Sequence, residues 1–278
     1  MVVPILCYGA ELWGYEYCHS IEHIHVKFCK YLLGVSNSTP TAAVLGELGR
    51  TPISMTYNVK CIKYWLKLLE MDDNRLPRLC YKLLHEYDSS GRRTWATEVK
   101  NLLFEMGFGH AWTNQGVGDQ CLFINCFRDR LRDMAQQEWR NTVNSTPKLR
   151  TYTKFKSELS FEKYLTLNTA QYSLQLYTKF RCGVLQLEIE RGRHQNIETQ
   201  DRICKLCKLE VEDEYHFLMS CKELDDIRNK YLNNLVKPIN TYNFSALLSS
   251  QKEETLYRLI NYIRNAWRTR LIKIDAMH

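Results

Sequence analysis

The sequence predicts a mainly α-helical protein, and three observations support this fold class. Apolar residues recur at helical spacing along most of the 278-residue chain. One such run consists of Ile21, Ile24, Phe28 and Leu32. Only 12 Gly and 6 Pro are present to interrupt the helices. Strand-like alternation is confined to two short stretches, at 152–155 and 184–189, so helices should dominate.

The expected helices follow one another with short breaks between them. Ser20 is placed to cap the helix that contains Ile21 to Leu32, and Gly34 is placed to end it. Pro52 opens a long helix, because the missing N–H of proline costs nothing at the first helical position. Further helices are expected at 76–87, 95–106, 119–142 and 172–180, and an amphipathic basic helix is expected near the C-terminus.

The chain divides by pattern and charge into three expected regions. Residues 1–118 form a helical region, 119–195 a basic helical linker, and 196–278 a metal-binding module with C-terminal helices. The linker carries most of the net charge of +7, since residues 128–193 hold 13 Lys and Arg against 7 Asp and Glu. A local excess of this kind is typical of a surface that meets a polyanion.

Cysteine usage and the absence of long apolar runs indicate an intracellular protein that does not span a membrane. Most of the 11 cysteines stand alone in apolar stretches, as buried thiols do. The first residues lack the basic start of a signal peptide, and no run approaches the length of a membrane helix. In a reducing compartment, clustered cysteines indicate a metal site rather than disulfides.

One segment carries a specific metal-binding pattern, C-x2-C-x8-H-x4-C. Its members are Cys204, Cys207, His216 and Cys221. Cys-x2-Cys points two thiolates at one ion, and His and Cys five residues apart lie on nearly the same side of a helical turn. Three Cys and one His close a tetrahedron and leave no position for a catalytic water. The sequence therefore predicts one structural Zn²⁺.

Basic residues around this segment are the candidates for a nucleic-acid-binding surface. The first group runs into the zinc segment and consists of Lys179, Arg181, Arg191, Arg193, His194 and Arg202. A second strip consists of Arg128, Arg132, Lys154 and Lys156. Side chains fixed by zinc and helix packing lose less entropy on binding than flexible tails do. The acidic run 210–214 is expected to lie away from this face.

No residues in the sequence form a convincing catalytic set. Met71-Asp72-Asp73 is similar to the paired aspartates that hold two Mg²⁺ ions in polymerases, but it follows a long helix and lacks the flanking strands. No P-loop, Gly-x-Ser-x-Gly or Gly-x-Gly-x-x-Gly motif occurs. The sequence favours binding over catalysis.

Three stretches together resemble a known family. They are Y-G-A-E-L-W-G at 8–14, A-V-L-G-E-L-G-R at 43–50, and L-E-I-E-R-G-R-H at 187–194 followed by the Cys and His pattern. They resemble the C-terminal region of LINE-type reverse transcriptases, which belong to retrotransposons without long terminal repeats. The resemblance implies an all-helical thumb, a helical linker and a CCHC zinc knuckle that grips template RNA and target DNA. It also implies that the RNA-directed DNA polymerase centre lies upstream, so the chain is expected to be a C-terminal piece.

The expected function is binding of RNA and DNA, without catalysis by this chain. The resemblance adds the remainder of the reverse transcriptase as an expected partner. The alternative is a zinc-stabilised helical module that binds another protein, or an inert or domesticated remnant of a retroelement. The resemblance favours the nucleus slightly over the cytoplasm. The salt dependence of the binding affinity distinguishes the two functions, because phosphate contacts weaken steeply with salt and apolar protein contacts do not.

Overall fold

The structure, a computed structural model, describes residues 2–14, 19–236 and 239–276 and is mainly helical. Within these residues no β-strand forms, and only two isolated bridges occur, Leu48 with Phe161 and Ile203 with Val211. The prediction of a mainly α fold is confirmed. The stretch 184–189 is not a strand, because a helix starts within it at Glu188.

Two compact units divide the chain differently from the expected regions. Unit 1 comprises Met1–Val26 and Thr51–Glu138, and unit 2 comprises Lys27–Arg50 and Trp139–His278. Neither unit begins or ends at the predicted boundaries, 118 and 195. The first part of the expected linker belongs to unit 1, and its remainder shares one hydrophobic core with the segment that contains the four predicted metal ligands.

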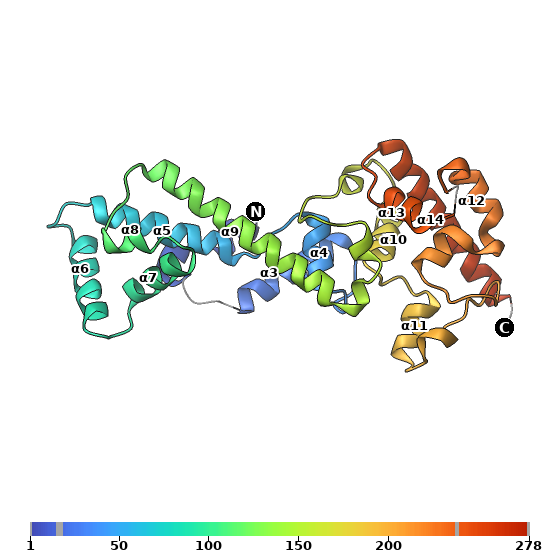
Figure 1. Ribbon diagram of the computed structural model, residues 1–278, viewed down its shortest axis with the longest axis horizontal. Coiled ribbons are helices and arrows are strands. Elements are labelled where there is room, and N and C mark those ends of the chain that lie inside the picture. Colours follow the sequence, from blue (N-terminus) through green and yellow to red (C-terminus); the bar gives the residue numbers. More distant parts are fainter. Residues whose placement is uncertain (1, 15–18, 237–238, 277–278) are drawn as a thin grey trace. The chain divides into compact units, whose positions relative to one another are not determined.

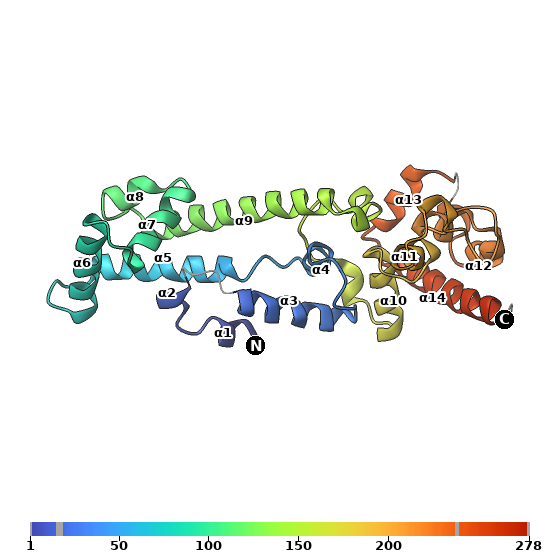
Figure 2. The same ribbon diagram turned by 90° about the horizontal axis from the view of Figure 1, so that it is seen from below.

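Unit 1 is built around the long helix that Pro52 was expected to open. Its helices are α1 (Val2–Leu6), α2 (Ala10–Trp13), α5 (Ser54–Glu70), α6 (Leu76–Ser89), α7 (Trp95–Glu105) and α8 (Gly109–Thr113). Helices α6 and α7 pack against α5 and against each other (Figure 2). Trp65, Trp112 and Phe127 lie in the core of this unit, with the rings of Trp65 and Trp112 stacked at 6.0 Å.

Unit 2 surrounds a larger core. Its helices are α4 (Thr41–Leu48), α10 (Gln171–Arg181), α11 (Glu188–His194), α12 (Asp225–Tyr231), α13 (Thr241–Leu248) and α14 (Glu253–Asp275). Helix α14 packs along α10 and also contacts α12 (Figure 1). Single turns of helix at Pro147–Leu149, Tyr152–Lys154, Lys163–Thr166, Thr199–Asp201, His216–Ser220, Lys222–Leu224 and Asn233–Val236 join the longer elements.

Two helices contribute residues to both units, α3 (His19–Leu33) and α9 (Gln120–Ser145). The apolar line predicted on α3 is helical but largely exposed, with Ile24 49% and Leu32 48% accessible. The buried side lies one residue further round, where Cys29 and Leu33 pack on Val44 of α4. Spacing placed these apolar residues on one face, but it did not say which face another element covers.

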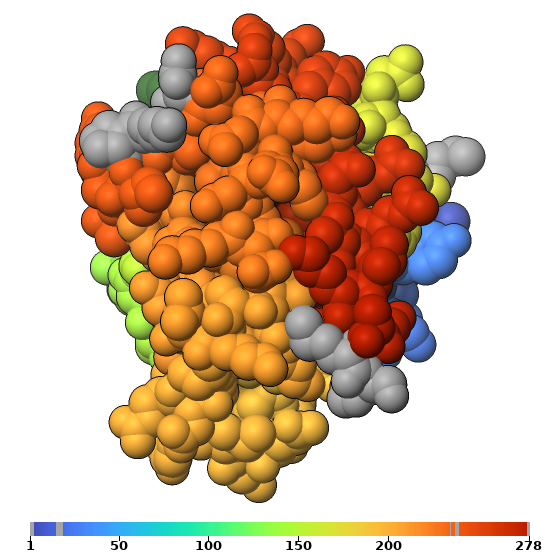
Figure 3. All heavy atoms as spheres, turned by 90° about the vertical axis from the view of Figure 1, so that its right-hand side faces the viewer, coloured from blue at the N-terminus to red at the C-terminus, as the bar shows by residue number. Residues whose placement is uncertain are grey.

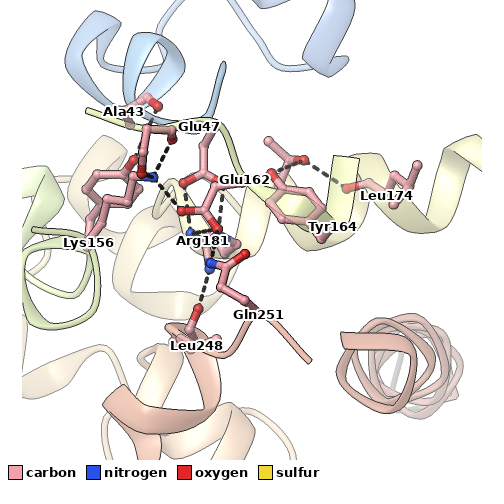
Figure 4. Close-up of polar contacts among 12 residues, drawn as sticks. Ala43, Glu47, Lys156, Glu162, Tyr164, Leu174, Arg181, Leu248 and Gln251 are labelled. Atoms are coloured by element: carbon pink, nitrogen blue, oxygen red, sulfur yellow. Dashed lines mark hydrogen bonds and ion pairs between the residues drawn. The ribbon is translucent and has the colours of Figure 1, made fainter. Parts of the chain in front are cut away.

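A buried cluster of four charged side chains connects Lys27–Arg50 to the rest of unit 2 (Figure 4). Arg181 is 1% exposed and donates two hydrogen bonds to Glu47, at 2.7 and 3.0 Å. It also lies 3.1 Å from Glu162, whose other oxygen is 2.5 Å from Nζ of Lys156. Two cations thus face two carboxylates, and the charges balance in the interior.

Aromatic rings and further hydrogen bonds complete the surroundings of Arg181. Its guanidinium lies 4.6 Å from the ring centre of Phe155 and 5.3 Å from that of Tyr164. The Tyr164 hydroxyl donates to Glu47 at 2.7 Å. Burial lowers the pKa of Arg181, but Glu47 and Glu162 more than offset this and keep the pKa well above its usual value. The cluster is charged and fully paired.

We expect Glu47→Gln to lower the free energy of unfolding of unit 2 by about 3–5 kcal/mol, because it leaves Arg181 buried without its bidentate partner. Amide hydrogen exchange distinguishes destabilisation of unit 2 from destabilisation of unit 1. Peptides from Gln171–Arg181 should lose protection, and peptides from Ser54–Glu70 should keep it. The matched control is Glu253→Gln, which removes an exposed partner of Lys163 and should cost about 1 kcal/mol or less. Equal losses for the two variants would contradict the proposed role of the cluster.

Candidate metal centre and basic surroundings

The four predicted metal ligands come together in unit 2, between α11 and α12. Their ligand atoms all lie within 4.8 Å of one another. The Sγ atoms of Cys204 and Cys221 are 3.9 Å apart, and Sγ of Cys207 is 3.4 Å from Nε2 of His216. Donor atoms bound at 2.0–2.3 Å to one tetrahedral ion would stand at about these separations. A Cys3His group that could bind a metal ion is therefore present.

A tight hairpin presents the first two ligands. The N–H of Cys204 donates to the Glu210 carbonyl at 2.8 Å, and the N–H of Lys208 donates to the Cys204 carbonyl at 2.9 Å. Lys208 adopts a left-handed conformation with φ +57°, which reverses the chain. Ile203 and Val211 pair across the hairpin as an isolated bridge. The turn holds both thiols on its inner side, as the Cys-x2-Cys spacing predicts.

A single π-helical turn, His216–Ser220, presents the other two ligands. The N–H of Cys221 donates to the carbonyl of His216 at 2.9 Å, which closes the wider turn. The side chain of Asp213 accepts from the His216 N–H at 2.7 Å and fixes the start of the turn. In a π-helix the N–H of residue i+5 bonds to the carbonyl of residue i, so residues five apart lie one turn apart on roughly the same side. The x4 spacing between His216 and Cys221 matches this geometry.

The imidazole of His216 is oriented for binding through Nε2. Its Nδ1 lies 2.9 Å from a carboxylate oxygen of Glu210 and 3.2 Å from the Ser220 hydroxyl. Histidine ligands in metal sites commonly donate their second ring N–H to a carboxylate, which fixes the ring and strengthens the ligand. Glu210 therefore supports the site without being a ligand. The sequence analysis did not identify this role of Glu210. Its position between the two pairs of ligands could have indicated a carboxylate that orients the histidine.

Protons and a metal ion compete for the Cys3His group. Burial lowers the pKa of His216, but hydrogen bonds to Cys204 and Glu210 raise it by more than burial lowers it. The net result is a pKa of about 9, above the usual value for histidine. The contact with Cys221, together with burial, raises the pKa of Cys204. A metal ion needs neutral imidazole and thiolates, so binding releases protons and strengthens as the pH rises.

Glu212 connects the segment 204–221, called the metal loop below because it contains the four candidate ligands, to the rest of unit 2. Its Oε1 lies 3.7 Å from Sγ of Cys204, and its carboxylate accepts from Arg270 of α14 at 2.7 and 2.6 Å. Arg270 also donates to Glu188 at 3.0 Å, and the backbone N–H of Glu188 donates to Glu212 at 2.8 Å. The metal loop, α11 and α14 thus meet at one buried ion cluster.

The acidic run 210–214 does not lie on the surface along its whole length. Glu212 and Glu214 are buried rather than exposed on a far face. Glu214 accepts from Arg150 at 2.9 Å and from the Thr151 hydroxyl at 2.8 Å. The position of Arg270 in the sequence could have indicated that Glu212 is buried. Arg270 follows Ile263 by seven residues and so lies on the apolar side of α14, where a buried cation needs a buried carboxylate.

Two predicted nucleic-acid-binding residues cannot meet a ligand. Arg181 and Lys156 belong to the buried cluster with Glu47 and Glu162, and both are less than 10% exposed. Their placement on a binding surface was wrong. The reason is that their partner carboxylates come from other parts of unit 2, which a local charge count does not reveal.

The other predicted basic residues are at least partly accessible. In unit 2 these are Lys154, Lys179, Arg191, Arg193, His194 and Arg202. In unit 1 they are Arg128, which is half-buried, and Arg132, which is exposed and ion-paired with Asp129 at 2.9 Å. The expected second strip is thus divided between the two units. Asp73 of the rejected aspartate pair lies in a loop and forms ion pairs with Arg78 and Lys82.

Arg202 braces the end of α11. It donates to the carbonyl of Ile197 at 3.0 and 2.8 Å and to that of Ile189 at 2.9 Å. Its side chain lies against Gly192, where a Cβ would come within 2.6 Å of it. Arg202 therefore positions α11 close to the metal hairpin that follows it.

No protein-family model, curated protein or solved structure matches the chain. Among the helices of the described residues, none is long and apolar enough to cross a membrane.

Cys204→Ser should reduce the bound metal from about one ion per chain to a small fraction of that value, because a tetrahedral site loses a thiolate. Elemental analysis measures the metal, and hydrogen exchange should show weaker protection across residues 193–224. Cys121→Ser is the control, since this exposed thiol lies on α9 in unit 1. Retention of the metal by the Cys204 variant would contradict the assignment.

Glu210→Gln should lower the metal affinity by about 10–100-fold, because the amide holds Nδ1 of His216 less strongly than the carboxylate does. Competition with a chromophoric chelator measures the affinity. Glu223→Gln removes an exposed carboxylate that binds Lys273 and leaves the imidazole untouched, so it should bind metal like the parent. Equal affinities of all three proteins would exclude a supporting role for Glu210.

Proposed function

We propose that the chain binds RNA and DNA through a basic surface of unit 2 that a structural Zn²⁺ keeps in place. We further propose that it does so as the C-terminal region of a LINE-type reverse transcriptase. The metal assignment rests on the donor set, since three thiolates and an imidazole in a closed tetrahedron are typical of zinc. Four protein ligands leave no open position, so the ion would have a structural role.

One observation carries the binding proposal, the sharing of a single buried carboxylate by two cations and an imidazole. Glu190 lies 2.7 Å from Lys148, 2.9 Å from Arg193 and 3.3 Å from His194. One negative charge cannot neutralise both Lys148 and Arg193. The end of α11 therefore has an excess of positive charge, and phosphate groups would neutralise it.

Lys30 adds to this excess. Burial is the main cause that lowers the pKa of Lys30, and the positive charge of Lys148 lowers it as well. The two ammonium groups therefore repel each other. Arg193 and His194 remain about half accessible and can reach a ligand, whereas Lys148 lies beneath them. A polyanion at this surface would relieve the repulsion, and its backbone contacts would carry little sequence information.

The metal site supports this surface mechanically. The buried cluster of Glu188, Glu212 and Arg270 joins the start of α11 to the metal hairpin, and Arg202 braces its end. Basic side chains on a fixed element lose less entropy on binding than those on a mobile one. Loss of zinc would therefore weaken nucleic-acid binding, because α11 would lose part of its support.

A second candidate function is binding to another protein through unit 1, and an exposed apolar line on α6 favours it. The line consists of Leu76, Leu79, Leu83 and Tyr87, which are between 37% and 72% exposed. Their spacing is that of a helix face that receives an amphipathic partner helix. Binding of this kind should depend little on salt.

Binding of a labelled single-stranded RNA and of a duplex DNA, followed by fluorescence anisotropy over a range of salt, tests the proposal. Arg191→Gln with Arg193→Gln should weaken both interactions by about tenfold and reduce the salt slope by about 2, because two phosphate contacts are lost. Arg92→Gln with Arg93→Gln removes the same charge from an exposed turn of unit 1 and should have little effect. If the parent binds neither nucleic acid, or the α11 variant binds like the parent at every salt concentration, the proposal is wrong.

A further inference from the structure

Helix α14 contains an uninterrupted basic stretch. From Thr255 to Ile274 the sequence has no acidic residue. Its basic residues are Arg258, Arg264, Arg268, Arg270 and Lys273. The same helix supplies much of the core of unit 2, and of its basic residues only Arg270 is buried.

Three of these cations have carboxylate partners. Arg258 pairs with Glu254 at 2.7 Å, Lys273 pairs with Glu223 at 2.5 Å, and Arg270 is buried between Glu188 and Glu212. Arg264 and Arg268 are exposed, and within the described part of the chain no carboxylate lies within 4 Å of either guanidinium.

The two unpaired arginines lie on the same side of α14. They are four residues apart, which places them about 6 Å apart along the helix axis. Like charges at this spacing repel and destabilise a helix slightly. Asn261 and Asn265 lie on the same side, and their amides donate to the carbonyls of Tyr257 and Asn261 at 2.9 and 2.8 Å. The result is a polar, positively charged face with no acidic side chain.

The opposite side of α14 is anchored in the core. Leu259, Ile263 and Ala266 are fully buried, and Arg270 fixes the helix to the metal loop. In Figure 3 the red C-terminal part of α14 lies open to solvent beside the orange segment that contains the metal ligands. The arginines therefore stand on a rigid support, which lowers the entropy cost of ordering them on a ligand.

We infer that this outer face of α14, formed by Asn261, Arg264, Asn265 and Arg268, binds the phosphodiester backbone of a nucleic acid. The inference rests on the proposed function and adds a second contact surface to α11. Guanidinium groups match phosphate oxygens in geometry and charge, and amides add hydrogen bonds to them. An anionic membrane is a poorer ligand, because the apolar side that would enter it is already buried in unit 2.

Single and double substitutions in the full chain test the inference. Arg264→Gln and Arg268→Gln should each lower the salt slope for duplex DNA by about 0.9, and the double variant by about 1.8. The affinity of the double variant should fall about tenfold or more at physiological ionic strength. Arg258→Gln is the matched control on the same helix, because this arginine already has a carboxylate partner, and it should leave the slope nearly unchanged.

The outcomes separate this inference from the proposed function. If the parent binds and the double variant has the same affinity and slope, the α14 surface is wrong, while binding through α11 stands. If the parent binds neither nucleic acid, both proposals fail. Vesicles containing phosphatidylserine are the comparison ligand, and loss of vesicle binding without loss of nucleic-acid binding would overturn the assignment to nucleic acid. Unchanged metal content and helical circular dichroism show that each variant is folded.

Discussion

The guanidinium of Arg270 joins three parts of unit 2 that are far apart in the sequence. It belongs to α14, and it donates to Glu212 in the metal loop and to Glu188 at the start of α11. All three side chains are buried, so removing one would leave an unpaired charge in the interior. The Cys3His group, the basic end of α11 and the outer face of α14 therefore hold fixed positions within unit 2.

Burial of carboxylates changes the charge that unit 2 presents to solvent. Glu188, Glu190, Glu212 and Glu214 lie inside and pair with cations. The nearly balanced charge of the metal-binding segment therefore does not describe its surface, where basic groups remain accessible next to carboxylates that are hidden. This distribution explains how a chain with a net charge of only +7 can present locally basic surfaces.

The sequence was informative where the determinants are local and misleading where they are distant. Helical periodicity predicted the main helices, and Cys204 to Cys221 span few enough residues for spacing alone to specify their convergence. Arg181 looked like a surface residue, because its partner Glu47 is 134 positions away in the chain. Arg270 lies seven residues after Ile263, on the buried side of its helix, and its partners Glu212 and Glu188 are 58 and 82 positions away in the chain. Periodicity also could not tell that Ile24 and Leu32 remain uncovered.

The ion pair between Glu47 and Arg181 also constrains the order in which the protein can fold during its synthesis. Unit 2 is discontinuous, and Glu47 emerges from the ribosome 134 residues before Arg181. Thr51–Glu138 of unit 1 is complete in that interval and can fold first. Until α10 and α13 follow, Glu47 has no cation, and Ala42 and Ala43 of α4 lack most of the core that covers them. A nascent chain stalled before Leu248 would therefore present this helix to chaperones and proteases.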